Sequence, residues 1–541
     1  MENDAMYALK IFSSHVSRLK SQVYLCSIME NRKVRVRFAP SPTGPLHMGG
    51  VRTALYNYLF AKKNGGDFIL RIEDTDTERF VPGAENYIIE SLKWCGIEPN
   101  EGVGFGDGPH APYRQSERKE KGMYAQYAKQ LIDAGHAYYA FDSKEELDEQ
   151  RKKYEAMKNS FSYNAITRQN LKNSLTLSED EVKKRIDAGE HYVVRIKIPR
   201  NEEVRLHDII RGWVVVHTSQ LDDKVLFKSD GMPTYHLANV VDDYLMKITH
   251  VIRGEEWLPS APLHVLLYRY LGWEEVMPQF SHLPLLLRPD GNGKLSKRDG
   301  DRLGFPVFPL DWEDPVSKEK SSGYRERGYF PEAFVNMLVL LGWHPSGNQE
   351  LFTKEELIND FSLERVSKSG AKFDAEKTKW FNQQYLRKKT DLELAELLCA
   401  NSGFNPETPG QNSKFVVEVC RLMKEKVFFV NEIYEQGKYF FEEPTVYDEA
   451  VIKKRWNDDS KKFIVAVKDS FEKISSWTAA DLESDFKKTD EATSTNPGSV
   501  MQLFRVCISG AGGGPVLFEM VELLGKETVL RRMKHFLEKN F

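Results

Sequence analysis

Residues 33–73 read "KVRVRFAPSPTGPLHMGGVRTALYNYLFAKKNGGDFILRIE". The first residues alternate polar and apolar side chains as far as Pro40, which predicts a strand. Apolar residues at helical spacing follow the paired glycines and stop at "NGG", residues 64–66, which predicts a helix. A second apolar run, "DFILRIE", predicts another strand. The stretch therefore predicts a β-α-β unit with parallel strands and a right-handed crossover.

Two polar segments follow these strands, "PSPTGPLHMGG" at 40–50 and "EDTD" at 73–76. Ligands of open parallel sheets bind at the carboxyl ends of the strands. We expect His47, Gly49 and Gly50 at the start of the helix, where unpaired N–H groups and the helix dipole favour an anion. The loop therefore predicts a phosphate site, although a tight surface turn explains it equally well when it is taken alone.

A second loop carries "KLSKR" at 294–298, in a glycine-flanked segment after an apolar strand. Its lysines and arginine can close over a triphosphate and stabilise the charge that develops on the leaving pyrophosphate. A solvated basic loop is the alternative, since charge runs are usually solvated. The loop at residues 40–50, which we call the histidine loop, also predicts a phosphate site. We therefore favour the nucleotide-binding interpretation.

The composition limits the class of protein. A chain of 541 residues with 41% hydrophobic and 29% charged residues is long enough for several globular domains. No apolar run reaches the roughly 18 residues that span a bilayer, which argues against a membrane-spanning protein. The net charge of −4 argues against a generic nucleic-acid coat but does not exclude local basic patches. Five scattered cysteines without a C-x-x-C pair predict neither a disulfide framework nor a zinc site, and they favour a reducing, cytoplasmic compartment.

The remaining chain is interpreted as a lobe, a second α/β stretch and a helical region. Residues 101–115 are rich in glycine and proline and read as a linker into the lobe. In the lobe we expect helices over 123–141 and 143–186, and short strands within 191–199, 204–217 and 224–233. In the α/β stretch we expect strands at 249–254 and 281–287 and a helix over 260–271. Beyond about residue 330, amphipathic helices replace strands.

The two loops and several further motifs resemble a known family. "HMGG" and "KLSKR" are similar to the two nucleotide-binding signatures of class I aminoacyl-tRNA synthetases. From about residue 33 to the C-terminus, the chain resembles the bacterial-type glutamyl-tRNA synthetases in "RFAPSPTGPLHMGGVRTALYNYL", "RIEDTD", "YRQSER", "YHLANVVDD" and "VIRGEE". The form "PSPTG" is typical of glutamyl enzymes, whereas glutaminyl enzymes usually carry "PEPNG".

The resemblance implies an α/β fold. It consists of a Rossmann-type class I catalytic domain with an inserted α+β acceptor-binding lobe, followed by an all-α anticodon-binding region. We accordingly divide the chain into 1–28, an N-terminal extension; 29–115 and 236–290, the two halves of the catalytic domain; 116–235, the inserted lobe; 291–390, the KLSKR loop and a stem-contact helical domain; and 391–455 and 456–541, two anticodon-binding helical subdomains. The extension is either disordered, a transit peptide, or upstream of the true start.

The resemblance also implies a glutamate pocket, made by Arg37, Ala39, Ser41, Glu73, Tyr235, Asn239 and Arg253. Free glutamate carries two carboxylates and one ammonium. Arg37 and Arg253 offer forks for the carboxylates, and Glu73 can hold the ammonium. Glutamine would leave one buried arginine unpaired, a penalty of a few kcal/mol. Without the resemblance, the arginines would be interpreted as surface or strand-edge residues and "EDTD" as a solvated turn.

The same resemblance places ATP against His47, Gly49, Gly50, Glu256, Lys294, Leu295, Ser296, Lys297 and Arg298, and it implies catalytic roles for His47, Lys294 and Lys297. The implied reaction is attack of the glutamate α-carboxylate on the α-phosphate of ATP, followed by transfer of glutamate to the 3′ end of tRNA(Glu). In this family, activation generally waits for bound tRNA. Mg²⁺ accompanies ATP and is held largely by its phosphates. We expect a monomer with L-glutamate, ATP and tRNA(Glu) as partners, and no membrane partner.

The sequence departs from the family pattern at three places. Some members bind zinc through Cys-x-Cys in the inserted lobe, but Ala140 and Asp142 stand there, so we predict no structural zinc and no other protein-held metal. Trp257 follows "VIRGEE", where members commonly continue with histidine. The segment 304–329 is longer than expected, and it is either an ordinary surface insertion or an added contact to tRNA or a partner.

Alternatives stay open. A small-molecule nucleotidylyltransferase can share both loops, but it needs neither the paired arginines nor the long helical region. A non-catalytic RNA-binding paralogue would not need His47 and Lys297. A non-discriminating synthetase would also charge tRNA(Gln). The sequence does not identify the residues that read the anticodon, although basic and aromatic residues could contact the tRNA there, among them Arg421, Lys424, Lys426, residues 453–456 and Arg505.

Overall fold

The computed structural model describes residues 32–76, 78–402, 413–493 and 497–539. The predicted N-terminal extension, residues 1–28, lies outside the described residues. The described residues form two compact units, one made of those up to 326 together with 335–374, and the other of 327–334 and those from 375 onward. Among the described residues, no helix is both long and apolar enough to cross a membrane.

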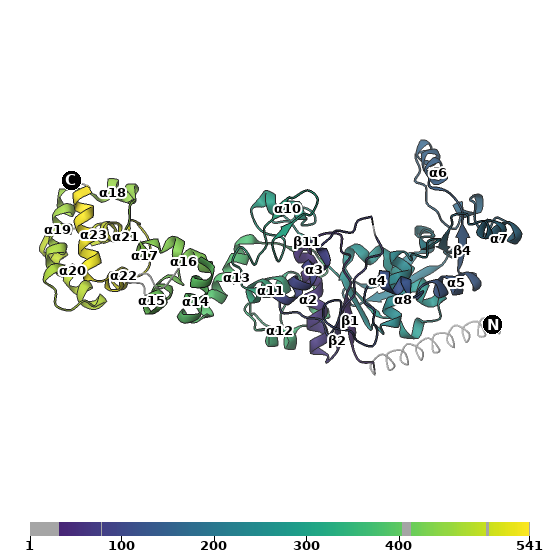
Figure 1. Ribbon diagram of the computed structural model, residues 1–541, viewed down its shortest axis with the longest axis horizontal. Helices are drawn as coiled ribbons and strands as arrows, with labels where there is room; N and C mark the ends of the chain where they lie inside the picture. Colours follow the sequence, from purple (N-terminus) through teal and green to yellow (C-terminus); the bar gives the residue numbers. More distant parts are fainter. Residues whose placement is uncertain (1–31, 77, 403–412, 494–496, 540–541) are drawn as a thin grey trace, which may run out of the picture. The chain divides into compact units, whose positions relative to one another are not determined.

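The catalytic part of the first unit is built on parallel strands. β1 (Arg35–Phe38), β2 (Asp67–Leu70) and β3 (Glu101–Gly102) pair in that order, with β1 and β2 side by side (Figure 1), and α2 (Met48–Lys63) connects β1 to β2. On the other side of β1, Thr249 N donates to Arg35 O at 2.9 Å, just before β9 (His250–Gly254), which pairs in parallel with β10 (Gln279–Leu283). The predicted β-α-β unit is confirmed. The strand order reverses between β1 and β9, which is where open sheets bind ligands.

The core of this unit lies between the sheet and α2. Val36 and Ile69 of the strands are fully buried, and so are Val51, Leu55 and Leu59, which recur at helical spacing along α2. The apolar face of the helix therefore packs against the strands, and it holds the loop that precedes the helix at the carboxyl end of β1.

The inserted lobe has its own antiparallel sheet, formed by β4 (Ala137–Ala140), β5 (Val193–Ile196) and β8 (Val225–Lys228). The helix expected over 123–141 is wrong in its second half. α5 (Ala125–Asp133) ends before Gly135, whose φ of 73° does not continue a right-handed helix, and β4 follows.

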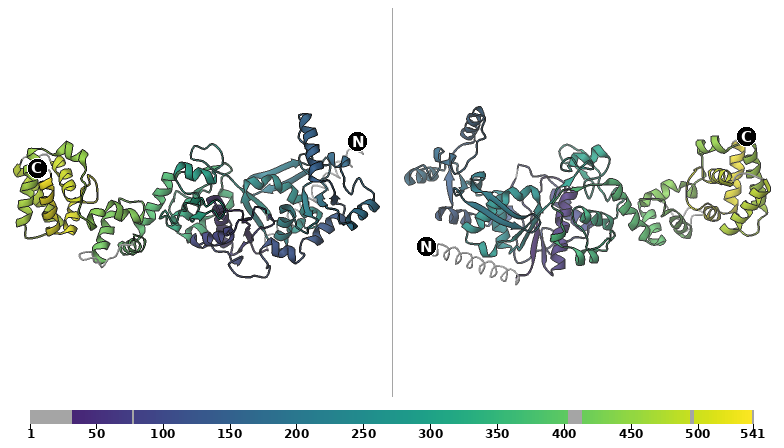
Figure 2. Two further views of the ribbon diagram at one scale, coloured as in Figure 1. Left: turned by 45° about the horizontal axis from the view of Figure 1, so that its top comes forward. Right: turned by 180° about the vertical axis from the view of Figure 1, so that it is seen from behind.

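The long helix expected over 143–186 is also wrong in its middle. α6 (Lys144–Ala156) and α7 (Glu179–Asp187) are separate, and the segment between them contains no α-helix but a short 3-10 turn, Thr167–Asn170, and a β-bridge from Asn173 to Ala140. α6 begins with a capping box at Ser143 and has no buried residue. It stands out from the rest of the lobe in all views (Figure 1, Figure 2).

A hairpin within the predicted lobe joins the catalytic sheet. β6 (Glu203–Asp208) and β7 (Gly212–His217) are antiparallel, and β6 pairs in parallel with β10 through Asp208 and Phe280. On strand pairing, the hairpin belongs with β9 and β10 rather than with β4, β5 and β8. This pairing brings Asp208 into the sheet that carries Arg253.

The segment 304–329 packs against the histidine loop. It contains a short hairpin of β12 (Trp312–Glu313) and β13 (Lys320–Ser321). Val307 O accepts from Met48 N at 2.9 Å, and the Phe308 ring lies edge-on to His47 with centroids 6.2 Å apart. From α3 (Ala84–Trp94), Tyr87 Oη donates to Leu310 O at 2.5 Å. The segment therefore supports the histidine loop. An additional contact of this segment to tRNA or a partner stays a prediction.

The second unit consists of packed helices with one continuous apolar core, to which Leu394, Val419, Phe463, Phe504 and Phe536 contribute fully buried side chains. Its helices are α13 (Ala375–Lys388), α14 (Asp391–Ser402), α15 (Ser413–Met423), α16 (Val430–Gln436), α17 (Lys438–Phe441), α18 (Glu449–Arg455), α19 (Asp458–Lys473), α20 (Ala479–Thr493), α21 (Pro497–Ser509), α22 (Leu517–Leu524) and α23 (Lys526–Lys539). The predicted helical region is confirmed.

The other helices and strands complete the first unit. They are α4 (Gln115–Glu120), α8 (Tyr235–Leu245), α9 (Ala261–Tyr270), α10 (Lys297–Leu303) and α12 (Lys354–Asp360), with the short strands β11 (Leu286–Leu287) and β14 (Ala371–Lys372). α11 (Pro331–Leu340) contributes residues to both units.

Candidate active site

A cavity opens at the switch point between β1 and β9, and we name it the arginine cavity. Its volume is about 240 Å³, and its walls come from the ends of both strands, the histidine loop, α8 and the segment after β9. The seven residues predicted to hold glutamate all line it: Arg37, Ala39, Ser41, Glu73, Tyr235, Asn239 and Arg253. The structure thus brings together side chains that are more than two hundred residues apart in the sequence.

A second cavity of about 420 Å³, the histidine cavity, adjoins the first. Gly50, Thr53, Gly254 and Glu256 line both cavities. Of the residues predicted to bind ATP, the following line it: His47, Gly49, Gly50, Glu256, Lys294, Leu295 and Ser296. The side chains of Lys297 and Arg298 lie outside the described part of the structure. The two loops identified in the sequence therefore meet at one cavity, beside the arginine cavity.

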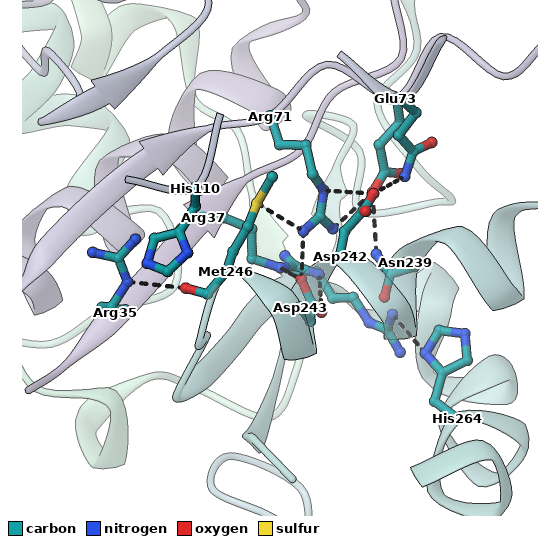
Figure 3. A network of polar contacts seen from close by, with 12 residues as sticks. Arg35, Arg37, Arg71, Glu73, His110, Asn239, Asp242, Asp243, Met246 and His264 are labelled. Atoms are coloured by element: carbon teal, nitrogen blue, oxygen red, sulfur yellow. Dashed lines mark hydrogen bonds and ion pairs between the residues drawn. The ribbon is translucent and has the colours of Figure 1, made fainter. Parts of the chain in front are cut away.

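Arg71, which is fully buried, is the centre of an ionic network (Figure 3), and three residues that belong to this network or contact it, Arg37, Glu73 and Asn239, line the arginine cavity. Its Nη1 contacts Asp243 Oδ1 at 2.7 Å, and its Nη2 contacts Glu73 Oε1 at 3.0 Å. Asn239 Nδ2 donates to the same Glu73 oxygen at 3.1 Å. Burial alone would lower the pKa of Arg71, but the surrounding carboxylates raise it, so this arginine stays charged.

Arg37 shares this network. Its Nε and Nη2 donate to Asp243 at 3.0 and 3.3 Å, which uses one edge of the guanidinium and leaves the Nη1 side for a ligand. Burial would raise the pKa of Asp243, but Arg37 and Arg71 lower it below its ordinary value. Burial raises the pKa of Glu73, and Arg71 opposes that shift. The charges of Arg37, Arg71, Glu73 and Asp243 therefore largely balance one another.

Arg253 is different, because its partners among the described residues are uncharged groups. Its Nε donates to His282 Nε2 at 3.1 Å, its Nη1 to Tyr235 Oη at 3.0 Å, and its Nη2 to Trp257 O at 3.3 Å. The side chain is 5% exposed, and burial lowers its pKa. A buried guanidinium without a carboxylate partner favours an anionic ligand, since the anion restores the missing charge balance.

The first turn of α2 departs from the sequence prediction. His47 is the N-cap, and its Nδ1 accepts from Gly49 N at 3.1 Å. Met48 N donates to Val307 O, and Gly50 N donates to His47 O at 2.8 Å. The expected unpaired N–H groups thus already have partners, and that part of the prediction is wrong. A phosphate would instead meet the Nε2 edge of His47, which carries the proton because Nδ1 accepts.

The KLSKR loop is anchored where it passes the cavity. Leu295 N donates to Leu286 O of β11 at 2.7 Å, and Ser296 caps α10 through Asp299. Lys294 Nζ lies 3.2 Å from Glu256 Oε1, and both side chains are exposed to a large extent. An exposed ion pair contributes little stability, so this lysine can exchange its partner for a phosphate at low cost.

Four residues at or next to this site had no role predicted from the sequence. Arg71 and Asp243 lie inside the quoted motifs "RIEDTD" and "YHLANVVDD", so a signal was present. Trp257 packs on Tyr235 with centroids 4.2 Å apart and forms part of the wall. His282 is recognised only from strand register, since it is the partner of Arg253 across β10 and β9.

Comparison with known proteins agrees with this geometry. A family model described as "tRNA synthetases class I (E and Q), catalytic domain" matches residues 33–380. The chain belongs to this family of class I synthetases. A second model, described as an anticodon binding domain, matches residues 385–537. The α/β class I catalytic domain and the helical anticodon-binding domain predicted from the sequence are therefore confirmed, while the finer domain boundaries stay a prediction.

Relatives in this synthetase family are similar over nearly the whole chain. The glutamate–tRNA ligase of Cytophaga hutchinsonii is 55% identical over 510 residues, which are 93% of this chain and 97% of that protein. The enzyme of the same name from Bacteroides fragilis is 55% identical over 94% of this chain and 99% of its own. A solved structure of a glutamate–tRNA ligase from Elizabethkingia meningosepticum, in complex with its amino acid, has a TM-score of 0.88 at 49% identity and covers 94% of this chain and 99% of its own.

The position where some synthetases of this kind carry zinc-binding cysteines has another role here. Asp142 Oδ2 accepts from Tyr163 Oη at 3.0 Å, and Asp142 Oδ1 accepts from Lys172 N at 2.9 Å. The carboxylate thus joins three segments of the lobe. Within the described ranges, no three or more His, Cys, Asp and Glu side chains gather as a metal site. That zinc is absent stays a prediction.

Two basic residues considered for tRNA contact are paired within the second unit. Arg421 contacts Glu418 and Glu519, each at 2.8 Å, and Lys424 contacts Asp391 at 2.7 Å. A cation that already forms an ion pair gains less free energy on binding a phosphate than an unpaired cation does, because the existing pair must break. In this synthetase the assignment of anticodon-reading residues stays open.

Proposed function

We propose that this protein is a glutamate–tRNA ligase, which activates L-glutamate with ATP and transfers it to the 3′ end of tRNA(Glu). The observation that carries the proposal is the guanidinium of Arg253, which has no carboxylate partner among the described residues and lies in a cavity that adjoins the histidine cavity. An acidic side chain supplies the missing negative charge, whereas the amide of glutamine does not. The high identity to glutamate–tRNA ligases over almost the whole chain supports the same conclusion.

We assign the following roles. Arg253 and the Nη1 side of Arg37 receive carboxylate groups of glutamate, and Glu73 receives its ammonium. The α-carboxylate attacks the α-phosphorus of ATP, and the bond to the leaving pyrophosphate breaks. His47 Nε2 and the lysines of the KLSKR loop stabilise charge on the phosphates. No protein nucleophile is needed, so positioning and charge stabilisation supply the catalysis.

ATP enters as its magnesium complex. The phosphates and water would hold the ion, since the described residues offer no cluster of metal ligands. We also propose that the enzyme is a cytoplasmic monomer, that residues 116–235 contact the acceptor stem, and that the helical region binds the anticodon arm. The second unit argues against a small-molecule nucleotidylyltransferase, which would have no use for it.

An ATP–pyrophosphate exchange assay tests the proposed function. Each amino acid is supplied with and without tRNA, and the tRNA is either tRNA(Glu) or tRNA(Gln). We expect exchange that requires glutamate and tRNA(Glu). Exchange with glutamine instead of glutamate, or without any amino acid, would reject the proposal. Exchange with glutamate and tRNA(Gln) would instead identify a non-discriminating enzyme.

Substitution of His47 separates its two roles. His47→Asn keeps an N-cap side chain for α2 but removes the Nε2 donor, so we expect kcat for glutamate activation to fall about 10²-fold while the thermal midpoint changes little. His47→Ala removes both and should also lower the midpoint. Single-turnover kinetics and thermal unfolding measure the two effects. A His47→Asn enzyme with wild-type kcat would show that the imidazole does not contact the reacting phosphates.

A further inference from the structure

Three buried side chains from three strands form a row behind the arginine cavity. Asp208 ends β6, His282 lies in β10, and Arg253 lies opposite His282 in β9. His282 Nδ1 is 2.6 Å from Asp208 Oδ2, and Arg253 Nε donates to His282 Nε2 at 3.1 Å. Asp208 and His282 are fully buried. All three stand on paired strands, so the ladder hydrogen bonds fix the register that brings them together.

The hydrogen-bond roles fix the proton on His282. Arginine N–H groups only donate, so Nε2 must accept and carries no proton. Nδ1 therefore carries the proton and donates to Asp208, whose Oδ1 accepts from the backbone N–H groups of Ile210 and Arg211. His282 is thus neutral. Its burial agrees with this assignment, because burial lowers its pKa although Asp208 opposes the shift.

A neutral imidazole between the two charges has an electrostatic consequence. Direct contact between Asp208 and Arg253 would neutralise the guanidinium and compete with an anionic ligand. His282 instead gives Arg253 Nε an uncharged acceptor, and its imidazole ring separates the Asp208 carboxylate from the guanidinium. Tyr235 Oη, His264 Nδ1 and Trp257 O contact the other nitrogens, and none of them adds a negative charge. The guanidinium is held in place while its charge stays available.

We propose that His282, oriented by Asp208, is a positioning residue that directs Arg253 toward the arginine cavity without neutralising it, and that it thereby contributes to the preference for glutamate over glutamine. This inference rests on the proposed function, because Arg253 is taken to receive a carboxylate of glutamate. It adds two residues, neither of which lines the cavity, to the determinants of specificity.

Two amide substitutions separate positioning from a structural role. The amide oxygen of His282→Gln can take the place of Nε2 and accept from Arg253, but it loses the donor to Asp208. The amide of His282→Asn can take the place of Nδ1 and donate to Asp208, but it does not reach Arg253. A structural role through Asp208 would make His282→Asn the milder change, whereas positioning of Arg253 makes His282→Gln the milder one.

Steady-state exchange kinetics with saturating tRNA provide the test. We expect His282→Asn to raise KM for glutamate about 10- to 100-fold, with a smaller change in kcat and an unchanged KM for ATP. His282→Gln should recover most of that loss. The ratio of kcat/KM for glutamate to that for glutamine should fall in His282→Asn. A glutamate KM close to the wild-type value in His282→Asn, or an equal loss in both variants, would overturn the proposal.

Asp208→Asn gives an independent measurement if a His282 variant does not fold. Its amide nitrogen can donate to Nδ1, which would move the imidazole proton to Nε2 and set two donors against each other at Arg253. We expect KM for glutamate to rise as in His282→Asn, and an unchanged KM would overturn the proposal. Failure of the proposed function is distinguishable, because the wild-type enzyme itself would then show no exchange with glutamate.

Discussion

Arg253→Gln is expected to lower kcat/KM for glutamate about 10³-fold. Removal of a buried, hydrogen-bonded cation from beside a carboxylate costs about 3–5 kcal/mol of interaction free energy. KM for ATP should stay close to the wild-type value, since Arg253 does not line the histidine cavity. The preference for glutamate over glutamine should also fall, because the uncharged amide at position 253 no longer requires a negatively charged partner. Steady-state exchange kinetics with both amino acids measure these effects.

Two further variants control for this experiment. Arg253→Lys keeps the charge but loses the fork, so an intermediate kcat/KM is expected. Arg269→Gln removes an arginine that lies on α9, is partly exposed and contacts Glu274 at 3.3 Å, and its kinetics should match the wild type. If Arg253→Gln kept the wild-type preference for glutamate, the guanidinium of Arg253 would not be the group that selects the acidic side chain.

Arg71→Leu is expected to destabilise the first unit by about 3–5 kcal/mol, which is the usual result when one partner of a buried ionic network is removed. The substitution leaves the Glu73 and Asp243 carboxylates buried without their shared cation, and it also removes the cation from beside Asp242, whose Oδ2 lies 3.9 Å from Arg71 Nε. Repulsion between these carboxylates adds to the desolvation penalty. Glutamate binding should weaken as well, since Asp243 would then hold Arg37 alone.

Thermal unfolding of the full chain measures this effect. The midpoint of the transition that includes the first unit should fall by about 5 °C or more. The matched control is Arg205→Leu on β6, whose exposed pair with Glu203 should be worth less than about 0.5 kcal/mol. Equal midpoints for the two variants would mean that the network around Arg71 does not stabilise the fold.

Features with a local signal could be predicted from the sequence. The alternation before Pro40, the helical spacing from Val51 to Leu59 and the stop at residues 64–66 predicted the β-α-β unit correctly. In the lobe a local signal was present but was interpreted wrongly. Gly135 ends the helix that was predicted to continue to residue 141, and the aromatic residues after it form β4. The seven residues assigned to the glutamate pocket came from the family resemblance, and periodicity alone would not have brought them together.

The remaining features depend on contacts between distant segments. Met48 N, at the start of α2, donates to Val307 O and is therefore not free to bind an anion. No sequence pattern near residue 48 predicts a partner so far along the chain. The β6–β7 hairpin joins the catalytic sheet through a register that involves residue 280. The row of Asp208, His282 and Arg253 follows from that register, so sequence spacing could not reveal it.

The central claim is that Arg253 receives a carboxylate of glutamate while the adjoining histidine cavity holds the nucleotide. A crystal structure of the protein with a non-hydrolysable glutamyl-adenylate analogue tests it most directly. We predict that a glutamyl carboxylate oxygen lies about 3 Å from a guanidinium nitrogen of Arg253, with the adenylate between His47 and Lys294. A glutamyl group bound away from Arg253, with that guanidinium turned out of the cavity, would contradict the claim.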